Sequence, residues 1–325
     1  MPTLKDVARE SGLTVTTVSR VLNNRGYISA DARSRVEEAI KKLNYHPNEV
    51  ARSLHNKTSN TIGLIVPHIR HPYFAEMISN IENAAFKKGY KVLLCSSHAR
   101  EDRAKEYVDI CTRNRVAGII LCSGAIPVEI FEGLSVPVIT VERYLDNGTA
   151  SVECDNKHGG ELAALRLIDS GCRNLLFIGS TKDIELPADL RGVGFKEVCE
   201  KHAVRYIEVD PERNLYSDMS YQEFIEEILK QYPDVDGLFA SSDVIAAQAL
   251  QVCRKLGISV PGELKIIGFD DVIIASLTSP QLTTIHQPVK EMSQAAVQLL
   301  ADVIAGKNIK QKTVLPVSLV ERETV

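Results

Sequence analysis

Apolar residues near the amino end recur at the three- and four-residue spacing of helices, in three short stretches. Each stretch follows a residue whose hydroxyl can cap a helix, namely Thr3, Thr14 and Ser29, and Asp6 can return a bond to the first cap. The apolar positions are Leu4, Val7 and Ala8, then Val18, Val21 and Leu22, then Val36, Ala39, Ile40 and Leu43. Residues 1–46 are therefore predicted to form three helices around one small core.

Two short helices joined by a glycine-containing turn, with a third closing the core, are typical of a helix-turn-helix DNA-binding domain. A purely structural three-helix domain is the alternative. The second helix favours DNA binding, because a solvated face in a structural bundle usually carries Glu and Lys. Its outer face instead carries Thr16, Thr17, Ser19 and Arg20, which are groups that can approach base edges and phosphates closely.

Residues 47–60 form a separate segment between this head and the rest of the chain. Asn48 can cap a helix of about two turns, which is marginal in water without support. The polar residues 57–60 follow it. We expect a short hinge helix that folds only when something else stabilises it, and then a linker.

From residue 61 onward, short β-rich runs alternate with helical stretches. The expected strands are 62–66, 91–95, 118–121, 138–141, 175–178, 205–209, 237–240 and 264–269, and the expected helices are 73–88, 100–114, 156–170, 190–201, 218–231 and 242–256. This alternation predicts an α/β fold in which helices cover both faces of parallel sheets. The number of units favours two similar lobes, and such sheets bind ligands beyond the carboxyl ends of their strands.

Composition excludes several classes of protein. The 325 residues are 44% hydrophobic and 25% charged, as in an ordinary globular protein of two or three domains. No apolar run is long enough for a membrane span, and the amino end shows no export signal. The seven cysteines contain no CxxC pair, so we expect reduced, buried thiols in a cytoplasmic protein rather than a disulfide or zinc framework.

Charge is distributed unevenly along the chain. Residues 1–60 contain ten Lys/Arg and six Asp/Glu, whereas the remaining 265 residues contain 28 and 36. The head therefore carries about +4 and the body about −8, within a total net charge of −4. A basic head on an acidic body suggests that only the head meets a polyanion.

Specific motifs extend this interpretation over nearly the whole chain. The head contains Leu4-Lys5-Asp6-Val7-Ala8, Thr17-Val18-Ser19-Arg20-Val21-Leu22-Asn23, and Pro47-Asn48 followed by Ala51-Arg52-Ser53-Leu54. The body contains Ile62-Gly63-Leu64-Ile65-Val66-Pro67, Pro72-Tyr73-Phe74, Arg191-Gly192-Val193-Gly194-Phe195, Gly268-Phe269-Asp270-Asp271 and Leu282-Thr283-Thr284-Ile285. In these motifs the chain closely resembles the LacI/GalR family of bacterial transcriptional repressors, and within it the sugar regulators such as the sucrose and ribose repressors.

The resemblance implies a domain plan. Residues 1–46 are the helix-turn-helix domain, 47–60 the hinge helix and linker, and 61–325 a two-lobed effector domain similar to type I periplasmic binding proteins. Its N-lobe covers about 61–157 and 288–317, and its C-lobe about 158–287 and 318–325. The resemblance also implies a homodimer on a pseudo-palindromic double-stranded operator in the bacterial nucleoid, with no cofactor, metal, catalytic residue or membrane partner. No heptad tail follows Val325, so we expect no tetramer.

By the same resemblance, particular residues are expected at the DNA. Val15 and Thr16 would read base edges, Arg20 a base or a phosphate, and Ser19 and Asn23 would meet phosphates, with Thr3 and Thr17 also at the DNA. In the hinge, Val50 would contact the dimer mate, Ala51 would lie on the operator, and Leu54 would enter the minor groove as an apolar wedge. Glu49 departs from the small or basic residue usual in the family.

A second set of residues is implied for the effector site: Tyr73, Phe74, Ser123, Arg143, Arg191, Tyr216, Ser242 and Asp270. Tyr73 and Phe74 would form an aromatic platform, the alternative being core aromatics. Arg191 would bind paired hydroxyls or a carboxylate, and Asp270 would accept two adjacent hydroxyls, while Asp271 would cap a helix. Ser123 has a turn serine as its alternative, and Arg143 a surface ion pair. His71 and Ser242 each replace the usual Asn of the family.

The function that follows is a sequence-specific repressor of a carbohydrate operon, controlled allosterically by a small effector. A sugar is favoured over a purine, and the sequence leaves open whether the effector induces or corepresses. A solute-binding protein is a competing hypothesis, because the body has the same two-lobed pattern. An enzyme such as a sugar hydrolase or kinase is a third, but no P-loop, GxSxG, HExxH or dinucleotide motif is present.

Overall fold

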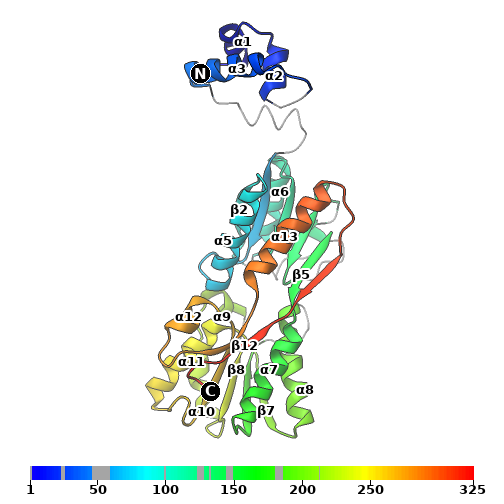
Figure 1. Cartoon of the computed structure of the whole chain (residues 1–325). Coiled ribbons are helices and arrows are strands. Elements are labelled where there is room, and N and C mark those ends of the chain that lie inside the picture. The colour runs from blue at the N-terminus through cyan, green and yellow to red at the C-terminus, as the bar shows by residue number, and fades with distance from the viewer. Residues whose placement is uncertain are drawn as a thin grey trace. The chain divides into compact units, whose positions relative to one another are not determined.

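The computed structural model describes residues 2–22, 26–45, 59–98, 100–122, 128–131, 133–143, 149–179, 186–211 and 213–325. The chain divides into two compact units, Met1–Ser59 and Asn60–Val325 (Figure 1). Within the described residues, no helix is long and apolar enough to cross a membrane.

The first unit contains helices α1 (Leu4–Ser11), α2 (Val15–Leu22) and α3 (Ala30–Leu43), as the hydrophobic spacing predicts. Ser29 caps α3 by accepting from the Ala32 amide, and Thr14 accepts from the Thr17 amide at the start of α2. The buried core consists of Val7, Ala8, Val18, Val21, Val36, Ala39 and Tyr45. The head therefore has the three helices and the apolar faces expected of it.

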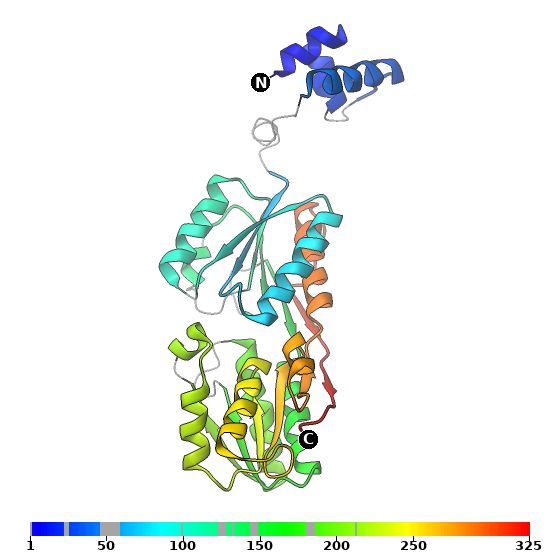
Figure 2. The same cartoon turned by 90° about the vertical axis from the view of Figure 1, so that its left-hand side faces the viewer.

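The second unit contains two six-stranded sheets (Figure 2). The first sheet has the order β11-β5-β4-β3-β1-β2, and all of its pairings are parallel. Its strands are β1 (Thr61–Val66), β2 (Lys91–Ser96), β3 (Gly118–Leu121), β4 (Val138–Val141), β5 (Ala150–Cys154) and β11 (Lys312–Leu315). The helical elements of this lobe are α5 (Pro72–Lys87), α6 (Glu101–Arg113), η1 (Val128–Phe131) and α13 (Val289–Ile304).

The second sheet has the order β12-β10-β9-β8-β6-β7, in which only the β10–β12 pair is antiparallel. Its strands are β6 (Asn174–Ile178), β7 (Arg205–Val209), β8 (Gly237–Ala240), β9 (Lys265–Asp270), β10 (Thr283–His286) and β12 (Ser318–Val320). Its helical elements are α7 (Asn156–Asp169), η2 (Pro187–Asp189), α8 (Leu190–Lys201), α9 (Arg213–Asp218), α10 (Gln222–Gln231), α11 (Asp243–Leu256) and α12 (Ile273–Leu277).

Alternate strand residues explain why helices cover both faces of a sheet. In the first sheet, Ile65 and Ile119 pack on the side of α6, whereas Ile62 and Ile120 pack on the side of α5 and α13. Figure 2 shows α6 on one face of this sheet and α5 and α13 on the other. The inner strands β1, β3 and β4 are buried along almost their whole length. Burial on both faces is what the continuous apolar runs of parallel strands require.

The chain passes between the two sheets three times: between β5 and α7, between β10 and α13, and between β11 and β12. Each crossing brings a short segment against the carboxyl ends of the strands of one lobe or the other. Two crossing residues, Asn156 and Gln287, prove to hold site side chains in place. Thus the connections themselves help build the junction between the lobes.

Several elements differ from the sequence expectations. Strand β5 and helix α13 were not among the expected elements. The helix expected over 218–231 begins later, as α10 (Gln222–Gln231), and a separate short helix, α9 (Arg213–Asp218), precedes it. Conversely, the seven cysteines are all free and buried, as predicted. The expected fold class, a two-lobed α/β body with parallel sheets behind a helix-turn-helix head, is confirmed.

Candidate DNA-binding face and effector site

The outer face of α2 presents a mixed surface. Val15, Thr16 and Arg20 are exposed, and Val15 keeps 40% of its surface although it is apolar. Val15 and Ser19, and likewise Thr16 and Arg20, are four residues apart and therefore lie one above the other on the helix. The combination offers a methyl group for thymine, a hydroxyl and a guanidinium, which are the groups that read base edges in the major groove.

Two other predicted DNA-contact residues, Thr3 before α1 and Thr17 on α2, already have partners within the head. Thr3 donates through its amide and its hydroxyl to Asp6 Oδ2, at 2.8 and 2.7 Å. These bonds lower the pKa of the Asp6 carboxyl. Thr17 Oγ1 lies 2.9 Å from Thr14 Oγ1. Both residues thus lie at the start of a helix. The hydroxyl of each can form one further hydrogen bond with a group outside the head.

Other sequence-predicted positions lie outside the described residues. These are Asn23 after α2, the hinge positions Val50, Ala51 and Leu54 together with Glu49, and Ser123 after β3. Their predicted roles stay predictions.

In the body, Arg191 at the start of α8 is nearly buried and held from several sides. Its Nε donates to Asn156 Oδ1 at 2.8 Å, and its Nη1 donates to the Ser241 carbonyl oxygen at 2.7 Å. The guanidinium carbon lies 3.7 Å from the centroid of the Phe269 ring, and Nη1 lies 3.9 Å from Asp270 Oδ1. These contacts fix the plane of the guanidinium. Among the described residues, its Nη2 has no hydrogen-bond partner.

Asp270, the last residue of β9, faces this arginine. Its Oδ1 accepts from Gln287 Nε2 at 2.6 Å. Burial raises the pKa of Asp270 to about 7, although Arg191 and Gln287 both favour the charged form. The backbone is strained here, with φ of 119° at Asp270 and 58° at Asp271, which are values that L side chains seldom adopt. A strained, buried carboxylate of this kind is typical of a functional site.

Glu142 supplies a second carboxylate from the other lobe, directly after β4. Its Oε1 accepts from the Cys154 amide at 2.6 Å and its Oε2 from Asn156 Nδ2 at 2.7 Å. Burial raises the pKa of Glu142, against the opposing effect of Arg191. Asn156 therefore binds Glu142 of one lobe and Arg191 of the other. We call Tyr73, Glu142, Asn156, Arg191, Asp270 and Gln287 the inter-lobe cluster.

Two polar atoms at the start of α5 have no hydrogen-bond partner among the described residues although they are buried. They are the Tyr73 hydroxyl and His71 Nδ1. Burial lowers the pKa of His71 to about 4, so its ring is neutral near pH 7. The Phe74 ring packs edge-on against both neighbours, with centroids 5.1 Å from Tyr73 and 5.6 Å from His71. Buried polar atoms of this kind normally bond to water or to a ligand.

The remaining predicted effector residues occupy different positions. Arg143 is buried rather than on the surface, and burial lowers its pKa to about 10. Tyr216 on α9 hydrogen-bonds the Ser241 side chain beside Arg191. Ser242 caps α11, its Oγ accepting from the Ile245 amide at 3.4 Å.

Asp271 does not cap a helix, contrary to the sequence expectation. Helix α12 begins after Val272, and Asp271 instead accepts from Arg322 at 2.6 Å and lies 3.0 Å from His286 Nδ1. With a φ of 58°, Asp271 places its side chain against Arg322 of the carboxyl-terminal segment and His286 of β10.

Sequence reasoning missed Asn156, Gln287 and Asp243 as site residues. Asp243 is fully buried, and it accepts from the Val272 amide at 2.9 Å and from Thr284 Oγ1 at 2.5 Å. It therefore holds the chain that leaves the strained end of β9. The one available signal was the adjacency of these residues to strand ends in the sequence.

Two glycines set the position of Arg191. A Cβ on Gly160 of α7 would overlap the Arg191 carbonyl oxygen, and a Cβ on Gly194 of α8 would overlap the Lys157 carbonyl oxygen. Helices α7 and α8 thus cross with their backbones in contact, which only glycine allows. This crossing brings Arg191 Nε to Asn156. Among the described residues, no group of three His, Cys, Asp or Glu side chains could hold a metal ion.

Comparison with known proteins follows the same division of the chain. Residues 3–48 match the model of bacterial regulatory proteins, lacI family, and residues 164–325 match a periplasmic binding protein-like domain. The chain is 37% identical to a ribose operon repressor of Halalkalibacterium halodurans over all of its length and 97% of that protein.

Two solved structures are also similar over most of their length. One is the lac repressor dimer bound to operator and the anti-inducer ONPF, with 25% identity, a TM-score of 0.87, and coverage of 99% of this chain and 98% of that one. The other is a periplasmic binding protein/LacI transcriptional regulator of Alkaliphilus metalliredigens QYMF complexed with D-xylulofuranose, with 32% identity, a TM-score of 0.74, and coverage of 82% and 99%. The chain belongs to the lacI family of bacterial regulatory proteins.

Proposed function

We propose that this protein is a homodimeric transcriptional repressor that binds a pseudo-palindromic operator of a carbohydrate-utilisation operon. The observation that carries the proposal is the face of α2, where exposed Val15, Thr16 and Arg20 form a surface suited to the major groove. The operator-bound relative and the ribose operon repressor support the same role. Asn23 and the hinge residue Leu54 would complete the contact with phosphates and the minor groove.

The effector is a small sugar bound at the inter-lobe cluster. Asp270 and Gln287 Oε1 offer acceptors for adjacent hydroxyls, while Arg191 and the Tyr73 hydroxyl offer donors. Phe74 provides an aromatic face for the C–H side of a sugar ring. The sugar complex of a related regulator supports a carbohydrate ligand. Arg143, Tyr216, Ser242 and Ser123 would form the outer wall of this site.

The two lobes communicate through the same residues that hold the ligand. Asn156 joins Glu142 of the first lobe to Arg191 of the second, so a ligand that displaces either partner changes the energy of lobe closure. In a homodimer, such closure would alter the spacing of the two heads over the operator. Exposed apolar side chains on α5, β2 and α12 support dimerisation: Phe86, Leu94, Ile273 and Leu277.

Two other functions are weaker. The function of a solute-binding protein does not account for an exposed, base-reading face on α2. An enzymatic function is disfavoured because a relative in this family is a ribose operon repressor. Reproducible turnover of a sugar by the purified protein would favour an enzyme instead. We place the protein in the cytoplasm, where operator DNA is found.

The proposal is tested by titrating the full chain against symmetric and scrambled duplexes at several salt concentrations. We expect preference for a symmetric duplex and a steep loss of affinity with salt, because each neutralised phosphate releases counterions. A panel of sugars, sugar phosphates and purines then identifies the effector by thermal shift, since a ligand stabilises the state it binds. A flat salt profile would reject DNA as the partner of the head.

A further inference from the structure

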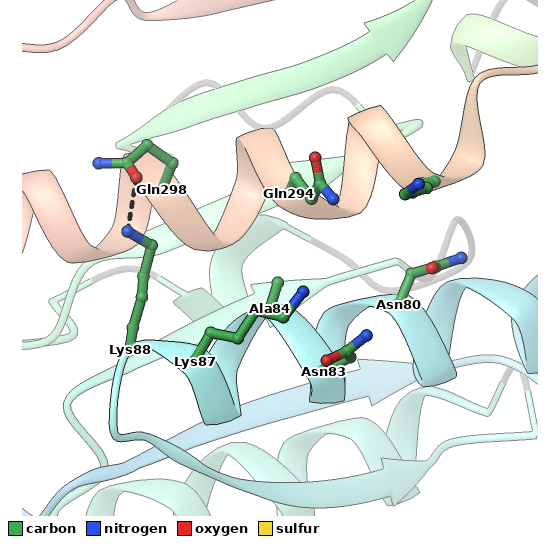
Figure 3. Close-up of a pocket in the computed structure, with 8 residues that line it drawn as sticks. Asn80, Asn83, Ala84, Lys87, Lys88, Gln294 and Gln298 are labelled. Carbon is green, nitrogen blue, oxygen red and sulfur yellow. Dashed lines mark hydrogen bonds between the residues drawn. The ribbon is translucent and has the colours of Figure 1, made fainter.

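A hollow of about 340 Å³ lies between α5 and α13 on the first lobe, away from the inter-lobe cluster (Figure 3). All but one of its lining residues carry an ammonium or an amide: Asn80, Asn83, Ala84, Lys87, Lys88, Lys290, Gln294 and Gln298. The volume is at the lower end of the roughly 300–1,000 Å³ typical of small-molecule sites.

The three lysines of this hollow have no ion-pair partner among the described residues and lie around one concavity. Within the described part of the chain, Lys87, Lys88 and Lys290 form no ion pair, and neither do Lys105 and Lys201, which do not line the hollow. Six other lysines of the effector domain each pair with a carboxylate: Lys157, Lys196, Lys230, Lys255, Lys307 and Lys312. The surrounding body is acidic overall. Three ammonium groups gathered around one concavity without such a paired carboxylate create a local positive potential.

One neighbouring carboxylate offsets part of this charge. Asp302, near one end, accepts from Gln298 Nε2 and from Lys307 Nζ, both at 2.8 Å, and these bonds together with the charges of Lys307 and Lys88 lower its pKa. Glu291 follows Lys290 on α13, and Glu82 precedes Asn83 on α5, and neither is among the lining residues. Lys88 is held at the edge by a 2.5 Å bond to Gln298 Oε1.

Charge and amides are arranged in sequence along the hollow (Figure 3). Lys87 and Lys88 lie at one end, at the level of Gln298, and Lys290 lines the hollow from the beginning of α13. Eight residues of helix separate Lys290 from Gln298, a rise of about 12 Å at 1.5 Å per residue. Amides, which can both donate and accept, lie between the two cationic ends.

We propose that this hollow is a second ligand site, which binds a hexose-sized sugar carrying a phosphate at each end. The ammonium groups of Lys87 and Lys88 would bind one phosphate and that of Lys290 the other. Asn80, Asn83 and Gln294 would hydrogen-bond the hydroxyls between them. The site is separate from the inter-lobe cluster and goes beyond the proposed function.

The test is a calorimetric titration of the full chain, at fixed ionic strength, with glucose, glucose 6-phosphate and glucose 1,6-bisphosphate. We expect the bisphosphate to bind at least tenfold more tightly than the monophosphate. The Lys87→Gln/Lys290→Gln double variant should lose at least tenfold in affinity for the bisphosphate. A Lys105→Gln/Lys201→Gln variant, with the same change of charge at exposed sites on other helices, should bind it as the wild type does.

An Arg191→Met variant locates the binding. It should retain the bisphosphate, because the guanidinium belongs to the inter-lobe cluster and not to the hollow. Loss of bisphosphate binding in Arg191→Met, equal weakening by the two lysine pairs, or no binding by the wild type would each overturn the proposal. None of these results bears on operator binding by α2, so the two proposals fail separately.

Discussion

Replacing Arg191 by Met removes the positive charge at the centre of the inter-lobe cluster while keeping much of the side-chain volume. Two hydrogen bonds from the guanidinium are lost, to Asn156 Oδ1 and to the Ser241 carbonyl oxygen, and Asp270 and Glu142 stay buried without a nearby cation. Removing one partner of a buried charge pair typically costs about 3–5 kcal/mol. We expect the free energy of unfolding of the effector domain to fall by about that amount, and the pKa of Asp270 to rise further.

Chemical denaturation at pH 7, followed by circular dichroism, measures the loss, and operator titration with and without effector measures function. Arg191→Lys is the matched control, because it keeps the charge but cannot make both hydrogen bonds in the same plane. We expect it to regain part of the stability and little of the effector response. A stability equal to wild type in Arg191→Met, with the effector response intact, would refute the assignment of Arg191 to the core of the site.

Three further predictions concern separate features. Gly194→Ala adds a Cβ that overlaps a carbonyl oxygen of α7, so we expect a lower unfolding midpoint and a weaker effector response. The control variant Lys201→Ala, at the exposed end of α8, should change neither. Effector affinity should be constant well above pH 7 and fall by up to tenfold per pH unit below it. The reason is that Asp270, with a pKa of about 7, must lose its proton before it can accept hydrogen bonds from hydroxyls. Asp270→Asn should bind the effector weakly, with an affinity that does not depend on pH. Arg20→Gln should weaken operator binding by tenfold or more, about 1–3 kcal/mol for one base contact, and Lys41→Gln on α3 should have a smaller effect; equal losses would remove Arg20 from the base-reading face.

The three helices of the head and the alternation of strands and helices in the body were predictable, because both depend on the local periodicity of apolar residues. The spacing of Val18, Val21 and Leu22 predicts which side of α2 is buried, and it leaves Thr16 and Arg20 outside. Strand β5 was not predictable in this way. Its residues Ala150–Cys154 include few β-branched side chains, and its burial depends on pairing with β4 and with β11, which comes about 160 residues later.

The candidate site was predictable only for the residues that belong to recognisable sequence motifs. Arg191 and Asp270 could be inferred from motifs, and the structure brings them within 3.9 Å of each other. Asn156 and Gln287 could not, because an amide beside a strand end or a proline has no particular local signal. Their importance arises where the chain passes between the lobes, and that convergence is a property of the topology.

A repressor of this kind reads a symmetric operator with the exposed face of α2, under control of the inter-lobe cluster. In the decisive experiment, the full chain selects duplexes from a random pool, and the bound duplexes are sequenced. The selection is run with and without the sugar found by thermal shift. We expect enrichment of one two-fold symmetric sequence. The sugar should change its retention at least tenfold in the wild type and leave it unchanged in Asp270→Asn. Enrichment of no sequence, or of one whose retention the sugar alters equally in both proteins, would contradict this expectation.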